Sequence, residues 1–361
     1  MAAPLQPLLQ TPQSSPDTQT ERIDPLAGEA WDALVTSRPE HSVFHRSAWA
    51  RVLAETYQHR PFYLRILVMG AEAALVPLME VRSPVTGRRG VSLPFADFAG
   101  PLWTAPGQGT AVYRALLEVA ADRKWKHLEL RGGSAPAPGT RPFRTYRGHE
   151  LYLSAGVSSI AKRLPASTRR SIHQAERSGL TITVGHDPRA MGEFYQLHGR
   201  TRRRHGLPPQ PFGFFQAIGR HLIEPGMGGI VLAHLAGTAV AGAVFFHSGN
   251  RAIYKFGASD QDHWHLRPNH LVMWSGIQYL LDAGCQSLHF GRTANDDAGL
   301  IRFKHSWACA DGTLSYFRYQ TGKLAWVADE NPPVESLPLV FGHLPISLNR
   351  IAGRLIYPHL D

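Results

Sequence analysis

Apolar residues recur at the three- and four-residue spacing of a helix in several stretches of the chain. The clearest stretch is residues 268–284, where Pro268 suits the first helical turn and Gly284 suits the position just after the last one. Leu271 and Ile277 lie between these two stops, among other apolar residues. The same spacing predicts helices over residues 25–37, 47–57, 108–122, 188–204 and 212–223, and a basic helical stretch over 157–178 that Pro165 interrupts.

Shorter apolar runs between turn residues predict strands. Residues 61–81 predict a strand, a tight turn at Gly70 and a second strand, and residues 229–259 predict three strands joined by Ala-Gly and Gly-Asn turns. Single strands are expected over residues 127–131, 180–184, 286–290 and 314–319. Because helices and strands alternate in this way, the predicted fold class is α/β with mixed sheets.

The order of elements in the first half reappears in the second. VMGAEAALVPL corresponds to HLAGTAVAGAVFF, and KHLELRGG corresponds to QSLHFGRT, at similar places in the two halves. Two copies of one α/β domain explain these parallels, and 361 residues suffice for two domains of about 150 each. Pro, Gly and Thr accumulate near residues 136–148, where we place the junction. We expect a disordered tail over 1–20, domains over 21–147 and 148–325, and a C-terminal tail over 326–361.

The C-terminal tail contains an amphipathic segment, LPLVFGHLPISLNRIAGRLIYPHL, at residues 337–360. A helix there would either close the core of the second domain or lie on a membrane interface. We expect the first arrangement, with peripheral membrane contact through this segment as the alternative.

Cysteine usage and the start of the chain predict a cytoplasmic protein, peripheral at the inner membrane face if the tail makes contact. No run of eighteen apolar residues occurs, and residues 1–20 lack the basic and apolar regions of a signal peptide. Cys285 and Cys309 are the only cysteines, which is too few for a disulfide framework. His263 and His265 lack the spacing of a zinc motif, so we expect no metal site.

The net charge of +10 is concentrated in one part of the chain. Residues 123–220 hold 18 Lys and Arg against 5 Asp and Glu. A surplus of this size favours an anionic partner such as RNA, a nucleotide-linked sugar or a membrane surface, although any single arginine is more often part of a solvated helix face. We expect no DNA partner.

Polar side chains gather directly after the strand predicted over residues 286–290. Ligands of α/β sheets tend to bind beyond the carboxyl ends of strands, so this loop and the short helix after it are the first candidate site. Within fourteen positions the sequence supplies Arg292, Asn295, Asp296, Asp297, Arg302, Phe303, Lys304 and His305.

The segment FGRTANDDAGLIRFKHSWAC resembles the C-terminal signature of the FemAB-like proteins, in which a strand ending Asp-Phe-Gly precedes Gly-Leu-x-x-Phe-Lys. His289 replaces the aspartate, while Phe290, Gly291, Phe303 and Lys304 fit, as do Gly299 and Leu300. The resemblance implies two tandem acyltransferase domains of the GNAT type. It also implies transfer of an amino acid from aminoacyl-tRNA to an amine on a cell-envelope precursor, namely a precursor of peptidoglycan.

The same resemblance implies roles for individual residues. Lys304 would stabilise the oxyanion that forms during acyl transfer, and Phe303 would pack on the acyl donor, so these two are the predicted catalytic residues. Without the resemblance, a structural arrangement would be more ordinary than a catalytic one. In that arrangement Phe303 packs beneath the sheet and Lys304 points into solvent. SLPFADFAGPLW resembles the family's Leu-Pro-Phe loop, in which Asp97 would orient the acceptor amine.

Two basic segments resemble further family elements, RRSIHQAERSGL with Arg169 and TRRRHGL with Arg204. Arginine binds phosphate through a planar fork of donors, so Arg169, Arg204, Arg292 and Arg302 are predicted to bind substrate, either a diphosphate or the tRNA acceptor stem. Each of these arginines could equally lie on a solvated face.

The sequence also argues against CoA as the acyl donor. GNAT enzymes hold the CoA pyrophosphate on a glycine-rich turn at a helix start, but residues 265–270 contain no glycine and Pro268 removes one N–H. The resemblance implies aminoacyl-tRNA as the co-substrate, and we expect no tightly bound cofactor and an anionic small-molecule or lipid-linked acceptor. The alternatives are an acyl-CoA-dependent N-acyltransferase and a non-catalytic protein that binds RNA or envelope material.

Overall fold

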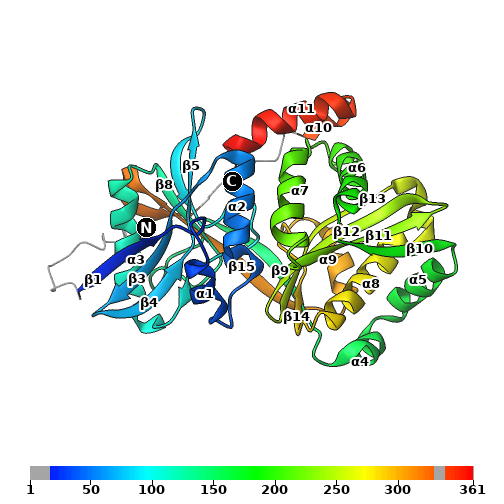
Figure 1. Ribbon diagram of the computed structural model, residues 1–361, viewed down its shortest axis with the longest axis horizontal. Helices are drawn as coiled ribbons and strands as arrows, with labels where there is room; N and C mark the ends of the chain where they lie inside the picture. Colours follow the sequence, from blue (N-terminus) through cyan, green and yellow to red (C-terminus); the bar gives the residue numbers. More distant parts are fainter. Residues whose placement is uncertain (1–16, 329–337, 361) are drawn as a thin grey trace, which may run out of the picture.

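The computed structural model describes residues 17–328 and 338–360. Figure 1 shows two lobes side by side, the N-terminal half in blue and cyan and the C-terminal half in green and yellow. The elements of the N-terminal half are β1 (Thr18–Ile23), α1 (Ala30–Thr36), α2 (Ser47–Tyr57), β2 (Arg60–Pro61), β3 (Tyr63–Val68), β4 (Ala71–Val76), β5 (Met79–Ser83), β6 (Gly87–Val91), β7 (Leu102–Trp103), α3 (Gly109–Asp122) and β8 (His127–Arg131).

The C-terminal half carries the longer strands and most of the helices. Its elements are β9 (Arg144–Tyr152), α4 (Gly156–Arg163), α5 (Ala166–Glu176), β10 (Leu180–Gly185), α6 (Pro188–Arg204), α7 (Phe212–Ile218), β11 (Gly228–Leu235), β12 (Thr238–Ser248), β13 (Arg251–Ser259), α8 (Pro268–Asp282), β14 (Ser287–His289), α9 (Ala298–His305), β15 (Ala310–Gln320), β16 (Ala325–Val327), α10 (Pro338–His343) and α11 (Ile346–Ile356).

One long sheet runs through both halves in the order β10-β11-β12-β13-β14-β9-β15-β8-β6-β5-β2. β15 joins the halves because it pairs with β9 along one edge and with β8 along the other. Tyr316 is the residue at which the two pairings meet, opposite Arg144 on one side and Arg131 on the other. A second sheet, in the order β1-β3-β4-β7, lies within the N-terminal half.

The predicted repeat is visible in how each half pairs its strands. In the first half α3 leads into β8, which lies parallel to β6. In the second half α8 leads into β14, which lies parallel to β13. The mixed α/β fold of two GNAT-like domains, predicted from the sequence, is confirmed by this arrangement and by the structural neighbours described below.

Two boundary predictions need correction. The junction placed between residues 147 and 148 falls inside β9, which continues across it because its residues are paired with β15. The prediction of a disordered tail over residues 1–20 is wrong for its last residues, because Thr18, Gln19 and Thr20 pair with β3 in an antiparallel ladder. Residues 1–16 lie outside the described part of the chain.

The two halves also share an aromatic core. Trp49 on α2 lies edge-on to Phe214 on α7, with 5.9 Å between ring centroids, and 6.2 Å from Phe246 on β12. All three side chains are fully buried. Burial of each large aromatic side chain contributes a few kcal/mol to the stability of the fold, so this contact helps to hold the two lobes together. The boundary between the lobes is called the seam below.

The C-terminal helix packs against the protein with its polar side, whereas the sequence predicted that its apolar side would close the core. α11 contacts α6 and the loop after it through polar and small residues, including the buried Asn349 and Gly353. Its leucine and isoleucine side chains at Leu348, Ile351 and Leu355 are exposed, so the helix does not close the core with its apolar face. No helix in residues 17–328 and 338–360 is long and apolar enough to cross a membrane.

Candidate functional site

Two parallel strands diverge at the seam between the lobes and open the candidate site. β13 and β14 pair only where Arg251 to Ile253 lie beside Ser287 to His289. Beyond these pairs β13 continues to Ser259, while the chain leaves β14 and turns into the loop that leads to α9. The polar loop predicted to carry chemistry therefore begins at a split in the sheet, as expected for a ligand site at strand ends.

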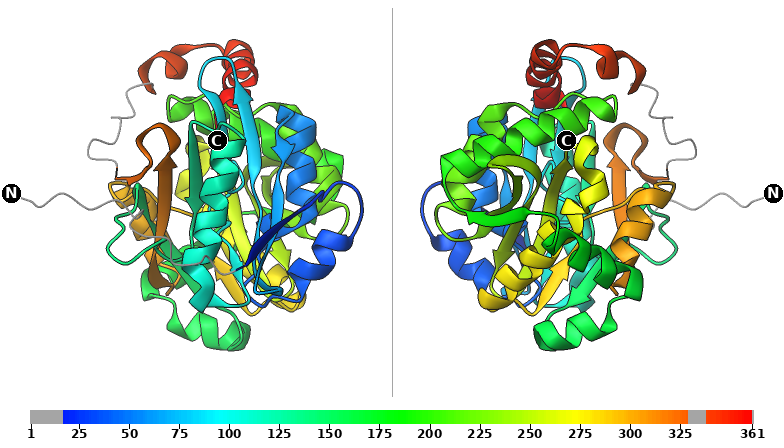
Figure 2. Two further views of the ribbon diagram at one scale, coloured as in Figure 1. Left: turned by 90° about the vertical axis from the view of Figure 1, so that its left-hand side faces the viewer. Right: turned by 90° about the vertical axis from the view of Figure 1, so that its right-hand side faces the viewer.

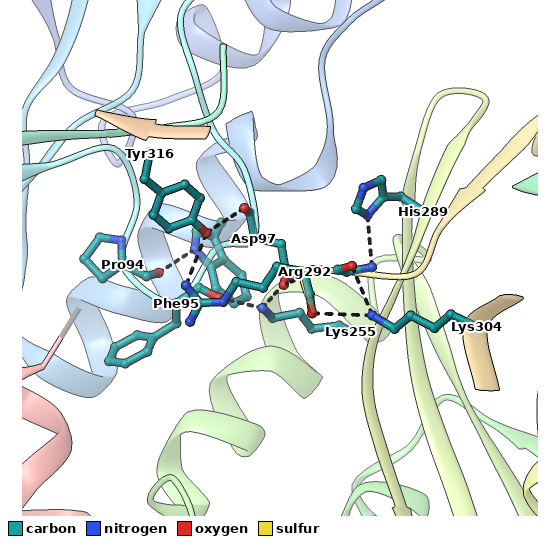
Figure 3. A network of polar contacts seen from close by, with 10 residues as sticks. Pro94, Phe95, Asp97, Lys255, His289, Arg292, Lys304 and Tyr316 are labelled. Carbon is teal, nitrogen blue, oxygen red and sulfur yellow. Dashed lines mark hydrogen bonds and ion pairs between the residues drawn. The ribbon is translucent and has the colours of Figure 1, made fainter. Parts of the chain in front are cut away.

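Lys304 points from α9 back into this loop rather than into solvent. Its Nζ donates to Thr293 Oγ1 at 2.7 Å, to the carbonyl of Gly291 at 3.1 Å and to that of Arg292 at 3.4 Å. An ammonium has three N–H donors, so all three are used within the protein. Figure 3 shows the side chain reaching toward the cluster around Asp97.

Burial changes the acidity of this lysine. The side chain is 2% exposed, and desolvation lowers the pKa of Lys304 to about 8, against a smaller opposing effect of Asp97. The ammonium is thus retained at neutral pH and begins to deprotonate just above it.

Asp97 and Lys255 form a buried ion pair at the centre of the seam. Lys255 Nζ lies 2.6 Å from Asp97 Oδ2 and also donates to the carbonyl of Phe95. The backbone N–H of Arg292 donates to Asp97 Oδ1 at 3.0 Å, and the Tyr316 hydroxyl donates to the Asp97 carbonyl at 2.7 Å. The network joins the loop after β6 to β13, β15 and the loop after β14 (Figure 3).

The charges of this network are unbalanced. Burial alone would raise the pKa of Asp97, but Lys255 and Arg292 outweigh it and lower the pKa to about 2. Lys255 is paired with this carboxylate and Arg292 and Lys304 are two further cations near it, so this network holds more positive than negative charge. A positive site in a low-dielectric environment is suited to a group that becomes negative, such as the oxyanion of acyl transfer.

Arg292 is held by two aromatic rings as well as by hydrogen bonds. Its guanidinium lies 5.0 Å from the centre of the Tyr146 ring and 5.7 Å from that of Tyr316, and Nη1 donates to the Tyr316 hydroxyl. These contacts hold the guanidinium in a fixed orientation at the seam.

Phe303 occupies a different side of α9 from Lys304. Its ring packs 6.1 Å from Trp307 and 5.8 Å from His270. The family resemblance predicted that Phe303 packs on the acyl donor beside Lys304. In the structure the half-buried Phe303 ring packs instead against the hydrophobic core of the C-terminal half. Arg302, also predicted to bind substrate, is exposed, and its side chain has no hydrogen bond or ion pair with another described residue.

Arg169 and Arg204 lie in separate regions. Arg169 Nη1 donates to the carbonyl of Leu164 at 2.7 Å and so caps the end of α4. Arg204 lies over the Trp264 ring and donates to the carbonyl of Ser259. It also lines a cavity of about 540 Å³, here called the Arg204 cavity, whose other polar lining residues are Arg200, Arg203, His205, Gln261 and His343.

A cluster with metal-ligand chemistry lies beside Lys304. One ligand atom each from His149, His305 and Asp311 falls within 4.8 Å of the others, and both ring nitrogens of the buried His149 have no hydrogen-bond partner. Burial, reinforced by Lys304, lowers the pKa of His149 to about 4. The imidazole is therefore neutral and able to ligate, but the cation of Lys304 opposes a divalent ion at this place.

Three residues of the site were not predicted from the sequence. Lys255 could have been noticed as a lone charge within the apolar strand AIYKFGAS. Tyr316 gave no signal of its own. His289 was noted only as a departure from the aspartate of the family signature; its Nδ1 accepts the backbone N–H of Gly291, so the proton of the neutral ring lies on Nε2.

Comparisons with known proteins find an acyltransferase domain in the part of the chain that carries Lys304. Residues 162–305 match the model of the acetyltransferase (GNAT) domain family. The range ends one residue after Lys304 and includes β13, β14 and α9, so it covers the split in the sheet but not Asp97.

Among characterised relatives, the chain is similar to the Lipid II:glycine glycyltransferase of Staphylococcus saprophyticus subsp. saprophyticus. The two are 32% identical over 80 residues, which are 20% of this chain and 19% of that protein. The corresponding enzyme of Staphylococcus epidermidis is 28% identical over 100 residues, or 26% of this chain and 23% of that protein. The matched segment thus spans less than a quarter of these relatives.

Solved structures match over most of the chain. FemX superposes with a TM-score of 0.65 and 15% identity, covering 82% of this chain and 96% of FemX. A tandem GNAT protein from the clavulanic acid biosynthesis pathway gives a TM-score of 0.54 and 12% identity, covering 85% of this chain and 99% of that chain. The chain thus carries a GNAT domain over residues 162–305, is similar to lipid II:glycine glycyltransferases over a short segment, and shares its fold with FemX over most of its length.

Proposed function

We propose that the protein is an acyltransferase that forms an amide between an aminoacyl group, delivered by aminoacyl-tRNA, and an amine on a cell-envelope precursor. The observation that carries the proposal is the buried Lys304 ammonium, which lies under residues 291–293 where β13 and β14 part. The positive excess of the seam supports the same chemistry, because the reaction develops negative charge on oxygen.

The reaction needs no covalent enzyme intermediate. The acceptor amine attacks the ester carbonyl carbon, the new C–N bond forms, and the carbonyl oxygen becomes the oxyanion of a tetrahedral intermediate. Collapse of that intermediate breaks the ester C–O bond, and the proton that the amine loses passes to the ribose oxygen, which leaves as the hydroxyl of the tRNA. Burial raises the pKa of Cys285 to about 11 and that of Cys309 to about 12, which disfavours either thiolate as a nucleophile.

Within this scheme the lysine acts on the oxyanion through its charge and through the loop that it holds. Its hydrogen bonds fix the carbonyls of Gly291 and Arg292 and the hydroxyl of Thr293. Arg292 supplies a second cation, and Asp97 holds Lys255 and the Arg292 backbone in place rather than meeting the acceptor amine.

The start of α8 favours tRNA over CoA. Arg267 precedes the helix in a left-handed conformation, and Pro268 occupies its first turn without an N–H. A pyrophosphate cradle needs successive backbone N–H groups at this place. The experiment is a transfer assay with charged tRNA or acetyl-CoA as donor and a panel of envelope precursors as acceptors. Transfer from acetyl-CoA alone, with stabilisation by near-micromolar acetyl-CoA, would replace the proposal by the CoA-dependent alternative.

A basic face next to α9 suits the tRNA. α4 and α5 carry four arginine or lysine residues and one glutamate, Arg177 directly after α5 adds a fifth cation, and all five cations are exposed. The face adjoins the candidate site because Thr168 Oγ1 on α5 donates to the carbonyl of Ser306 at the end of α9.

Replacing two of these arginines should weaken tRNA binding and reduce its salt dependence. For Arg170→Ser/Arg177→Ser we expect the slope of log affinity against log salt to fall by about 1–2, because each lost phosphate contact removes roughly 0.7–0.9. Filter binding across a salt series measures this. Arg141→Ser/Lys323→Ser removes two exposed cations from the other lobe and should leave the slope unchanged; a flat response of the wild-type protein would contradict the tRNA donor.

A further inference from the structure

α11 is fixed to the protein by its polar side. Asn349 is 1% exposed and donates to the carbonyl of Leu207. Arg350 donates to Gln196 Oε1 at 2.7 Å and lies over the Tyr195 ring. Gly353 packs so closely that a Cβ there would lie 1.9 Å from the carbonyl oxygen of Pro209. The helix therefore cannot turn its other face inward without losing these contacts.

The outward side of α11 is apolar. Leu348, Ile351 and Leu355 follow the spacing of one helix face and are 49%, 55% and 66% exposed. Amphipathic helices of globular proteins normally bury such a face, since each large apolar side chain left in water costs about 1.5–3 kcal/mol relative to burial. In Figure 1 the helix lies along the outer edge of the molecule, above α6 and α7.

The Arg204 cavity lies at the start of α11, on the side of the helix that carries Arg350 and Gly353. Ile346, the first residue of α11, and His343 and Gly342 of α10 form part of its lining. Of the arginines in the cavity, Arg200 is paired with Asp260. Among the described residues, the side chain of Arg203 donates only to a carbonyl, that of Gly342, through Nε. The cavity thus offers guanidinium donors to an anion beside the start of α11.

We propose that α11 and the Arg204 cavity form a docking surface for an anionic phospholipid bilayer. The side chains of Leu348, Ile351 and Leu355 enter the boundary between headgroups and acyl chains, and the exposed Arg354 remains at headgroup level. A lipid phosphate occupies the cavity and accepts hydrogen bonds from the fork of Arg203. This surface would hold the enzyme at the cytoplasmic face of the membrane.

Charge and polarity together select this partner. A second copy of the chain, docked by a two-fold axis, would bring two such arginine-lined cavities toward each other. An RNA would satisfy the arginines but would leave three exposed apolar side chains in contact with water or phosphate. An anionic bilayer matches both parts, because it presents negative headgroups next to an apolar interior.

Vesicle sedimentation tests the proposal with the full chain. Wild-type protein should bind phosphatidylglycerol-containing vesicles, and Leu348→Ser/Ile351→Ser/Leu355→Ser should bind them about tenfold or more weakly. Arg203→Ser should lose the preference for phosphatidylglycerol over phosphatidylcholine. The matched control, Met69→Ser/Leu324→Ser, removes two comparably exposed apolar side chains outside α11 and should bind like wild type.

Several results would overturn the docking surface. One is equal vesicle binding by wild type and the α11 triple variant, both with unchanged thermal melting. Another is a wild-type dimer in solution that the triple variant converts to monomer, which would assign the face to a second copy. A third is tRNA binding that Arg203→Ser abolishes in a protein that ignores vesicles. The test does not involve acyl transfer, so its outcome is independent of the proposed reaction.

Discussion

Asp97→Asn should lower the free energy of unfolding by about 3–5 kcal/mol, since it leaves Lys255 buried without its counter-charge. The carboxylate is 6% exposed, and both oxygens are engaged, by Lys255 and by the Arg292 backbone. Urea unfolding at pH 7 measures the effect. Asp122→Asn, an exposed carboxylate on α3, is the matched control and should change stability by less than about 0.5 kcal/mol.

The pH dependence of stability gives a second check on the same group. The folded-state pKa of Asp97 is about 2, against 3.8 for an ordinary aspartate. Because the folded value is depressed, its contribution of about 2 kcal/mol is present above pH 4 and is lost as the pH falls toward 2. Asp97→Asn should lack this component of the acid dependence. Equal acid dependence in the two proteins would show that the ion pair does not stabilise the seam.

Lys304→Met should reduce turnover by about 10²–10³ while the protein remains folded, because it removes the cation beside the developing oxyanion without opening a large cavity. The expected change is in kcat with KM for charged tRNA little altered, which distinguishes loss of transition-state stabilisation from loss of substrate binding. Lys323→Met, an exposed lysine in the other lobe, controls for the loss of a positive charge.

The rate should also report the acidity of this lysine. Since the folded-state pKa of Lys304 is about 8, the ammonium is present below that pH and is lost as pH rises through it. We expect a falling limb of kcat near pH 8 in the wild type. In Lys304→Arg, whose guanidinium stays charged, whatever activity remains should lack this limb. Wild-type turnover in Lys304→Met would refute the role of the cation altogether.

The sequence predicted elements best where local chemistry marks their ends. α6 has its predicted bounds because Asp187 accepts the N–H of Ala190 and Pro188 fills the first turn, both of which are visible in the sequence. α2 and β8 also have their predicted bounds. β9 was missed because RTYRGHELY lacks an apolar alternation and is a strand only through its long pairing with β15.

The candidate site was predicted in part. Lys304 and Arg292 were placed correctly at the end of a strand, and Asp97 proved to lie beside them, although its partner Lys255 is 158 positions away and on the other lobe. Pairing across such a separation depends on how the lobes pack and leaves no local pattern. The amphipathic spacing of α11 likewise showed which of its residues share a face, but it did not show which face packs against the rest of the protein.

The bridging position of β15 has a consequence for how the molecule can be divided. If either lobe were expressed alone, one of the two strands that flank β15 would lose its partner and present a row of unpaired backbone N–H and C=O groups. Such edges recruit other chains, so a separated lobe would be prone to self-association. The two lobes therefore fold as one unit, in which neither lobe is self-sufficient.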